Sequence, residues 1–112
     1  MEVRGEVVDG VALYRIAGKI DALTGPDLHS VVSSAIGGGN PRIIFDMREV
    51  TYISSAGLRV IVLSAKQAKA ANGGFAVFGL QPAVSEVFEV AGFRTIIPIV
   101  SSEADARSTF GA

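Results

Sequence analysis

The sequence contains no cysteine and no tryptophan, and its 112 residues include only one histidine. The lack of cysteine excludes disulfides and thiolate-bound metals. A single histidine also excludes catalytic or metal sites that need two imidazoles or a Cys–His pair. The chain therefore has few of the side chains from which most catalytic centres are assembled.

Charged residues are scarce as well, at 19% of the chain, and the ten Lys and Arg nearly balance the eleven Asp and Glu. A net charge of −1 without a basic cluster argues against direct nucleic-acid binding, which depends on neutralising phosphates. An apolar content of 49% argues against disorder. The length is typical of one domain, and we expect residues 1–112 to form a single domain.

Long apolar runs are also missing. A membrane-spanning helix needs about 20 consecutive apolar residues. The longest run without charge, between Lys69 and Glu86, is interrupted by glycine, proline and polar residues. The first six residues do not have the basic and then apolar pattern of a signal peptide. We therefore expect a cytoplasmic protein that does not bind membranes.

The start of the chain predicts a β-hairpin. Residues 2–7 alternate between charged and other side chains, as in a strand with one solvated face. Asp9-Gly10 is typical of a type I′ turn, in which both central residues have positive φ. A returning strand is predicted over 11–17, and Gly18 is expected to interrupt it.

A first helix is predicted from about Thr24, with Thr24 as N-cap, Pro26 in the first turn and Asp27 as a capping-box partner. Gly37 and the residues after it end the helix. The apolar stripe of this helix consists of Leu28, Val31, Val32, Ala35 and Ile36.

The middle of the chain predicts a short buried strand, residues 43–45, that ends at Asp46. A loop over 47–53 is expected to lead into a second helix, which runs from 54–57 to about Ala71. The apolar stripe of the second helix consists of Leu58, Ile61, Val62, Ala65 and Ala68.

The last third of the chain continues the alternation of strand and helix. Strands are predicted over 75–78 and 95–100. A helix is predicted from Pro82 to Gly92, and its apolar stripe consists of Val84, Val87, Phe88 and Ala91. A final helix, capped by Ser101 or Ser102, is expected to end near Phe110. Pro98 indicates that the last strand lies at an edge of the sheet. The fold class is therefore α/β, with a mixed, mostly parallel sheet, an N-terminal β-hairpin and about four helices.

No catalytic or metal-binding pattern is present. His29 lies beside the apolar stripe of the first helix, where a solvated position is a sufficient explanation. The chain has no Gly-x-Ser-x-Gly elbow and no phosphate-binding loop before a helix. Four carboxylates, Asp46, Glu49, Glu103 and Asp105, do not have the spacing of a metal-binding loop. We therefore expect no catalytic residue, no metal and no cofactor.

Two adjacent serines mark the most distinctive segment. Ser54 and Ser55 lie where a loop enters the second helix, and a helix N-terminus stabilises an anion through its free N–H groups and dipole. A phosphate on either serine would carry about −1.5 to −2 charges. Gly57 in the first turn is expected to leave the backbone open to close approach. The alternative is that Ser54 or Ser55 serves only as an N-cap.

The segment 46–60, DMREVTYISSAGLRV, resembles the signature of STAS domains, the family of anti-sigma factor antagonists (anti-anti-sigma factors). The resemblance covers nearly the whole chain. Similar stretches are Gly18-Lys19-Ile20-Asp21 with Thr24, Gly73-Gly74-Phe75, and the helix from Pro82 to Gly92.

This resemblance implies a STAS-like fold and a partner switch. In this family a serine kinase of the anti-sigma type binds the unmodified domain, releases its sigma factor and then phosphorylates the domain. A phosphatase of the PP2C type restores the unmodified form. Aligned on Gly57 and Leu58, the family's phosphoacceptor falls on Ser55. Ser54 stands where the family often has Asp, and Ala56 where it often has Ser or Thr, which leaves Ser54 as a minor alternative acceptor.

The expected partner-binding surface surrounds this acceptor. It comprises Asp21, Thr24, Ile53, Ser54, Ala56, Gly57, Leu58 and Arg59. Asp21 matches the acidic residue that the family has beside the acceptor, although it could equally be a loop aspartate that caps the first helix. The second hypothesis is a non-phosphorylated STAS interaction or ligand-sensing module in a larger regulatory assembly. A small enzyme is the third.

Overall fold

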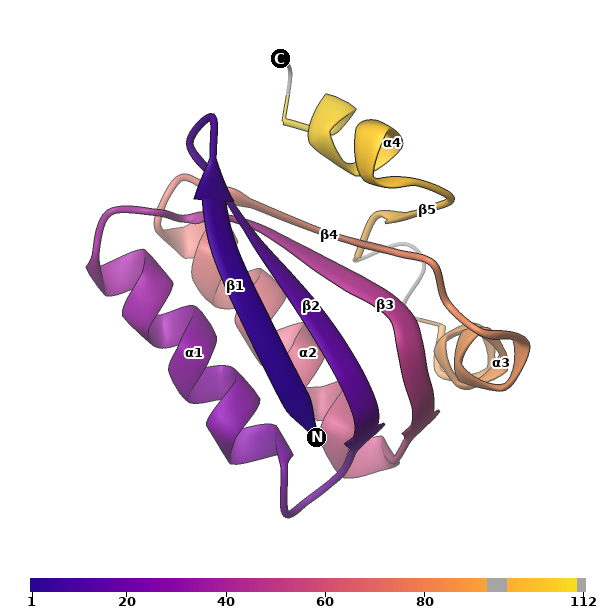
Figure 1. Ribbon diagram of the computed structural model, residues 1–112. Coiled ribbons are helices and arrows are strands. Elements are labelled where there is room, and N and C mark those ends of the chain that lie inside the picture. Colours follow the sequence, from indigo (N-terminus) through magenta and orange to yellow (C-terminus); the bar gives the residue numbers. More distant parts are fainter. Residues whose placement is uncertain (93–96, 111–112) are drawn as a thin grey trace.

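The computed structural model describes residues 1–92 and 97–110, and its strands form one sheet in the order β1-β2-β3-β4-β5 (Figure 1). The pair β1–β2 is antiparallel, whereas β2–β3, β3–β4 and β4–β5 are parallel. The elements are β1 (Glu2–Val8), β2 (Val11–Ile20), α1 (Gly25–Gly37), β3 (Arg42–Ile53), α2 (Ser55–Ala70), β4 (Gly74–Phe78), α3 (Pro82–Val90), β5 (Ile99–Val100) and α4 (Glu103–Ser108). The predicted mixed α/β sheet is therefore confirmed.

The hairpin between β1 and β2 has the predicted turn. Asp9 and Gly10 adopt φ values of 53° and 76°, so both central residues have the positive φ that a type I′ turn requires. The turn sets the register in which Val8 pairs with Val11 and Glu2 with Ala17.

Two strands are longer than their patterns predicted. β2 passes through Gly18 to Ile20, because Gly18 adopts a φ of 101° at a point where the pairing with β3 shifts register. The loop predicted over 47–53 is wrong, since β3 continues to Ile53 and its last residues pair with the end of β2. The two central strands consequently end side by side, with Ile20 opposite Ile53.

The helices bury the predicted stripes. All five stripe residues of α2 are buried, and in α1 Leu28 and Val32 are buried while the other three are half-buried. In α3, Val84 and Phe88 are buried, but Ala91 is exposed, so its predicted place in the stripe is wrong. Ala91 follows the last residue of the helix and occupies its C-cap position.

Two apolar layers enclose the sheet. α1 and α2 cover one face, where the larger core contains Ile16, Phe45 and Phe88, and α4 lies on the other face over Leu13 and Ile44 (Figure 1). Because α2 and α3 follow β3 and β4, their first turns begin beyond the carboxyl ends of these strands.

The C-terminal elements follow their signals. Ser102 caps α4, and its side chain accepts a hydrogen bond from the backbone N–H of Asp105 at 3.1 Å. β5 is an edge strand, as predicted, but the strand predicted over 95–100 is too long: residues 97 and 98 precede β5, and residues 95 and 96 lie outside the described residues. Within residues 1–92 and 97–110, no helix is long and apolar enough to cross a membrane.

Candidate functional site

The segment that carries Ser54 and Ser55 lies at the shared end of β2 and β3. The backbone N–H of Ser54 donates to the carbonyl of Ile20 at 3.0 Å, so the start of α2 is tied to the last residue of β2. The β2–α1 loop and the β3–α2 junction therefore meet at one end of the sheet (Figure 1).

Ser54 is the N-cap of α2. Its backbone is extended, with φ −89° and ψ 170°, and its hydroxyl accepts from the N–H of Gly57 at 3.1 Å. Its carbonyl accepts the first helical bond, from the N–H of Leu58 at 2.9 Å. The role of a capping serine therefore belongs to Ser54.

Ser55 is the first residue of α2, and its side chain is exposed. None of the described residues forms a hydrogen bond with its hydroxyl. No acidic residue occupies the first turn of α2, so no carboxylate neutralises the positive end of the helix dipole. The arrangement leaves Ser55 accessible to a modifying enzyme, without a base beside it that could make it a nucleophile by itself.

Three residues of the expected partner-binding surface are interior residues. Ile53 and Leu58 are each 3% exposed, and Gly57 is buried against the end of β2. A Cβ atom on Gly57 would collide with the carbonyl oxygen of Ile20. Gly57 therefore allows a close approach, but the expectation that it leaves the backbone open is wrong, because the protein's own β2 strand makes that approach.

Asp21 and Thr24 organise the β2–α1 loop. The Asp21 carboxylate accepts from the backbone N–H groups of Leu23 at 2.9 Å and Thr24 at 3.0 Å. The Thr24 hydroxyl accepts from the N–H of Asp21 and donates to the carbonyl of Lys19, both at 2.9 Å. These bonds, led by the one from the backbone of Thr24, lower the pKa of Asp21, which is therefore an anion in the loop.

The side-chain cap predicted for α1 is wrong. Thr24 occupies the N-cap position, but its side chain makes no capping bond because it is turned back into the loop. The capping box with Asp27 is consequently absent, and Asp21 binds the N–H groups that precede the helix. Asp21 and Thr24 are both half-buried and lie in the loop at the same end of the sheet as Ser55.

The sequence analysis did not single out Leu23, Tyr52 and Val90, which are among the exposed apolar side chains. Leu23 is 87% exposed in the β2–α1 loop, Tyr52 is 50% exposed near the end of β3, and Val90 is 84% exposed at the end of α3. The available signals were an apolar residue within a polar loop for Leu23, and a valine outside the stripe of its helix for Val90. Tyr52 gave no signal because its segment was read as a loop.

A groove of about 540 Å³ lies between α2 and α3. The α2 side is lined by Ser55, Leu58 and Arg59, and the α3 side includes Glu86 and Val90. Ser55 thus lies at the rim of a largely apolar groove that no pattern in the sequence indicated. Arg59 is exposed, and none of the described residues forms a hydrogen bond or ion pair with it.

β3 also carries a buried carboxylate, that of Asp46. Asp46 is 4% exposed, and Arg48 binds both of its oxygens, at 3.0 Å through Nε and at 2.8 Å through a terminal nitrogen. Burial alone would raise the pKa of Asp46, but the hydrogen bonds from Arg48 and the charges of Arg48 and Arg15 outweigh it and lower the pKa.

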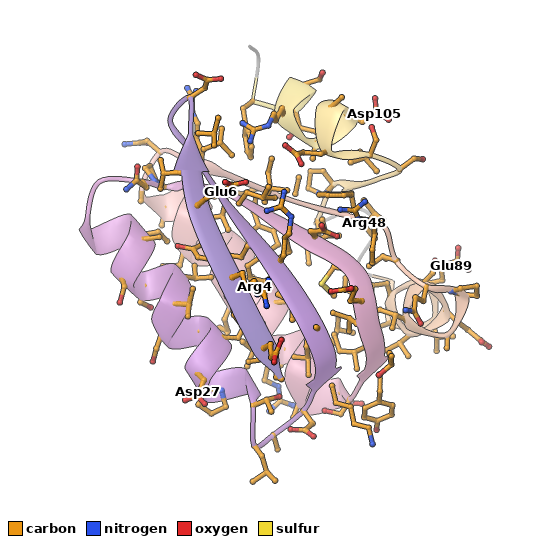
Figure 2. All side chains as sticks on the ribbon, in the orientation of Figure 1. Arg4, Glu6, Asp27, Arg48, Glu89 and Asp105 are labelled. Atoms are coloured by element: carbon orange, nitrogen blue, oxygen red, sulfur yellow. The ribbon has the colours of Figure 1, made fainter. Side chains whose placement is uncertain are left out.

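Arg48 also reaches the segment before α3. It lies over the Phe78 ring, 5.5 Å from the centroid, and its carbonyl accepts from the Gln81 amide at 2.9 Å. Figure 2 shows Arg48 beside β3, between α4 and α3 in that view. Among the described residues no group of three or more carboxylates and imidazoles could hold a metal ion. We interpret Asp46 as a structural residue that holds the side chain of Arg48.

Comparisons with known proteins were consistent with one another. A sequence model of the STAS domain matches residues 2–106. BtrV of Bordetella bronchiseptica is 33% identical over 110 residues, covering 98% of this chain and 95% of that protein. The anti-sigma-B factor antagonist of Listeria monocytogenes is 28% identical over 105 residues, covering 94% and 91%.

The solved structures agree in fold. A crystal structure of an anti-sigma factor antagonist from Mycobacterium paratuberculosis superposes with a TM-score of 0.88 at 22% identity, covering 99% of this chain and 94% of that one. The unphosphorylated anti-sigma factor antagonist SpoIIAA gives a TM-score of 0.74 at 17% identity, covering 96% of each chain.

Proposed function

The chain belongs to the STAS domain family, whose curated relatives include anti-sigma factor antagonists, and from this premise we propose that it is itself such an antagonist and acts by partner switching. In this proposal the unmodified protein binds a serine kinase of the anti-sigma type in the cytoplasm and frees the sigma factor that the kinase held. Phosphorylation of Ser55 by the same kinase ends the interaction, and a phosphatase of the PP2C type reverses it.

The observation that carries the proposal is that the hydroxyls of Ser54 and Ser55 have different environments. The Ser54 hydroxyl is engaged as the cap of α2, whereas the Ser55 hydroxyl is exposed and has no partner among the described residues. A kinase can therefore reach Ser55 without breaking a hydrogen bond of the fold. Phosphorylation of Ser54 would remove the cap and expose a backbone donor.

The proposed reaction needs only a serine hydroxyl from this chain. The Ser55 oxygen attacks the γ-phosphorus of ATP, the bond from that phosphorus to the β,γ-bridging oxygen breaks, and ADP leaves with the electron pair. The hydroxyl proton passes to a base of the kinase. In the reverse branch, water attacks phosphoserine at phosphorus, which regenerates the Ser55 hydroxyl and releases inorganic phosphate.

The helix N-terminus makes the phosphorylated state compatible with the fold. The unpaired N–H groups and dipole of the first turn of α2 favour a negative group there, and no acidic side chain in that turn repels it. A phosphate adds about −1.5 to −2 charges, which is large beside the net charge of −1. The domain can therefore accommodate a phosphate on Ser55, whereas the same charge would weaken binding to a partner surface that loses water in the complex.

A second candidate function is a non-phosphorylated STAS module that acts as an interaction or ligand-sensing unit in a larger regulatory assembly. The residues that favour it are Ser54 and Ala56, which replace the Asp and the Ser or Thr that often flank the family's acceptor. This function predicts that the wild type is inert to serine kinases of the anti-sigma class from the same genome and co-purifies with a different partner.

The test is to incubate the protein with Mg-ATP and the anti-sigma-type kinase encoded in the same genome, and to map phosphate by mass spectrometry. We expect one phosphate on Ser55 in the wild type and in Ser54→Ala, and none in Ser55→Ala. An unchanged phosphate yield in Ser55→Ala, or an inert wild type, would overturn the acceptor assignment.

A further inference from the structure

The groove between α2 and α3 is open and largely apolar at its rim. Val90 is 84% exposed and Ala91 is also exposed, while Leu58 lies in the groove at 3% exposure. An apolar side chain as exposed as Val90 contributes little to the stability of the isolated chain. Grooves of this kind between two helices are common binding sites for apolar segments of partner proteins.

The groove is continuous with the proposed phosphoacceptor, because Ser55 is one of its lining residues. A kinase that transfers phosphate to Ser55 must bring its own active site against this hydroxyl and exclude water from it. The kinase surface around that active site therefore covers the rim of the groove. This continuity makes the kinase the occupant that the position of Ser55 favours.

The two sides of the groove carry opposite charges. Arg59 on the α2 side is exposed, and no described residue pairs with its guanidinium, whereas Glu86 on the α3 side is negative. An occupant with a carboxylate toward α2 and none toward α3 matches this arrangement. Arg59 also follows Ser55 by four positions on the same helix, so the two side chains are neighbours on its surface.

We propose, on the basis of the function proposed above, that the α2–α3 groove receives an apolar segment of the kinase whose acidic side chain pairs with Arg59, and that phosphorylation of Ser55 displaces this segment. The phosphate arises next to Arg59 and offers the guanidinium a doubly charged partner from the same helix. Arg59 exchanges the carboxylate of the kinase for the phosphate. The kinase segment then faces a negative rim and leaves.

The first experiment tests the groove with a charge at Val90. Calorimetry compares the binding of the kinase to wild type, Val90→Lys and the control Leu63→Lys, which changes an aliphatic residue of α2 that is 48% exposed and lies outside the groove. We expect Val90→Lys to weaken binding by about tenfold or more and Leu63→Lys to leave it unchanged. Circular dichroism checks that both variants fold as the wild type does.

The second experiment tests the exchange at Arg59. For wild type, Arg59→Ala and Lys66→Ala, a control for an exposed cation of α2 outside the groove, the affinity of the kinase is measured before and after phosphorylation. We expect Arg59→Ala to weaken the first affinity by about tenfold and to reduce the ratio of the two affinities. Lys66→Ala should change neither value.

The outcomes separate the two proposals. A wild type that binds and is phosphorylated, together with Val90→Lys and Arg59→Ala variants that match it, would overturn the groove proposal and leave the proposed function intact. A wild type that neither binds nor is phosphorylated by the kinase would overturn both.

Discussion

The hydroxyl of Ser54 accepts a hydrogen bond from the backbone N–H of Gly57 at 3.1 Å, and this contact gives two adjacent serines different roles. Ser54 completes the first turn of α2, whereas Ser55, one residue further along, is exposed on the helix surface. The sequence left the capping role open for both residues, and in the fold Ser54 makes the capping bond.

Replacing Ser54 by alanine should destabilise the protein without removing the acceptor. Loss of the cap leaves the N–H of Gly57 without its partner, and we expect the free energy of unfolding to fall by about 0.5–2 kcal/mol. Urea denaturation measures this change. Ser55→Ala is the matched control and should unfold as the wild type does, since its hydroxyl has no partner among the described residues. Equal stability of Ser54→Ala and wild type would contradict the capping role.

Gly57→Ala should distort the junction of α2 with β2. The new methyl group meets the carbonyl of Ile20, and we expect a loss of about 1–3 kcal/mol in the free energy of unfolding. Gly37→Ala, at the end of α1 where nothing lies within 4 Å of an added Cβ, is the control and should be neutral or slightly stabilising. Thermal unfolding of the two variants compares them directly. A stabilised Gly57→Ala would show that a methyl group fits beside the Ile20 carbonyl and would contradict the tight junction.

Stability should depend on pH through Asp46. Because its pKa is lower in the folded state than in the unfolded chain, the ionised carboxylate stabilises the fold above the ordinary carboxyl pKa of about 4. This contribution is lost as the pH falls through the lowered pKa of the folded state. We expect Asp46→Asn to be less stable than wild type by about 1–3 kcal/mol at pH 7, with the difference shrinking below pH 4. The free energy of unfolding of both proteins is measured by urea denaturation from pH 7 to pH 2.5. A difference between them that stays constant over this range would contradict the assignment.

A glutamate at Ser55 should weaken binding to the kinase. The carboxylate places a negative charge in a contact that loses water on binding, and we expect affinity to fall by about tenfold in calorimetry. Ser30→Glu adds the same charge to an exposed position of α1 and should have no effect. Equal losses in both variants would indicate a general effect of charge and not one of the site.

Most of the fold could be predicted from local patterns. The Asp9-Gly10 turn and the stripe of α2 each encode their element in a few neighbouring residues. The end of β3 could not be predicted in this way. Its buried residues Met47, Val50 and Ile53 are spaced by three, where a regular strand would alternate, because the pairing with β2 is irregular there.

The candidate site was only partly predictable, because the groove depends on contacts between residues that are far apart in the sequence. The family-like motif and the helix start predicted Ser55 as the phosphoacceptor, and that prediction needs only local sequence. The contribution of Val90 to the groove depends on how α2 and α3 pack, and residues about 30 positions apart carry no periodic signal of their contact.

The affinity of the kinase for the unphosphorylated and the Ser55-phosphorylated protein tests the central claim most directly. Isothermal titration calorimetry with the two purified forms, at the same salt concentration and in the presence of ADP, gives both constants. We expect phosphorylation to weaken binding by about tenfold or more, because a dianion enters a desolvated contact. Equal affinity of the two forms would contradict it.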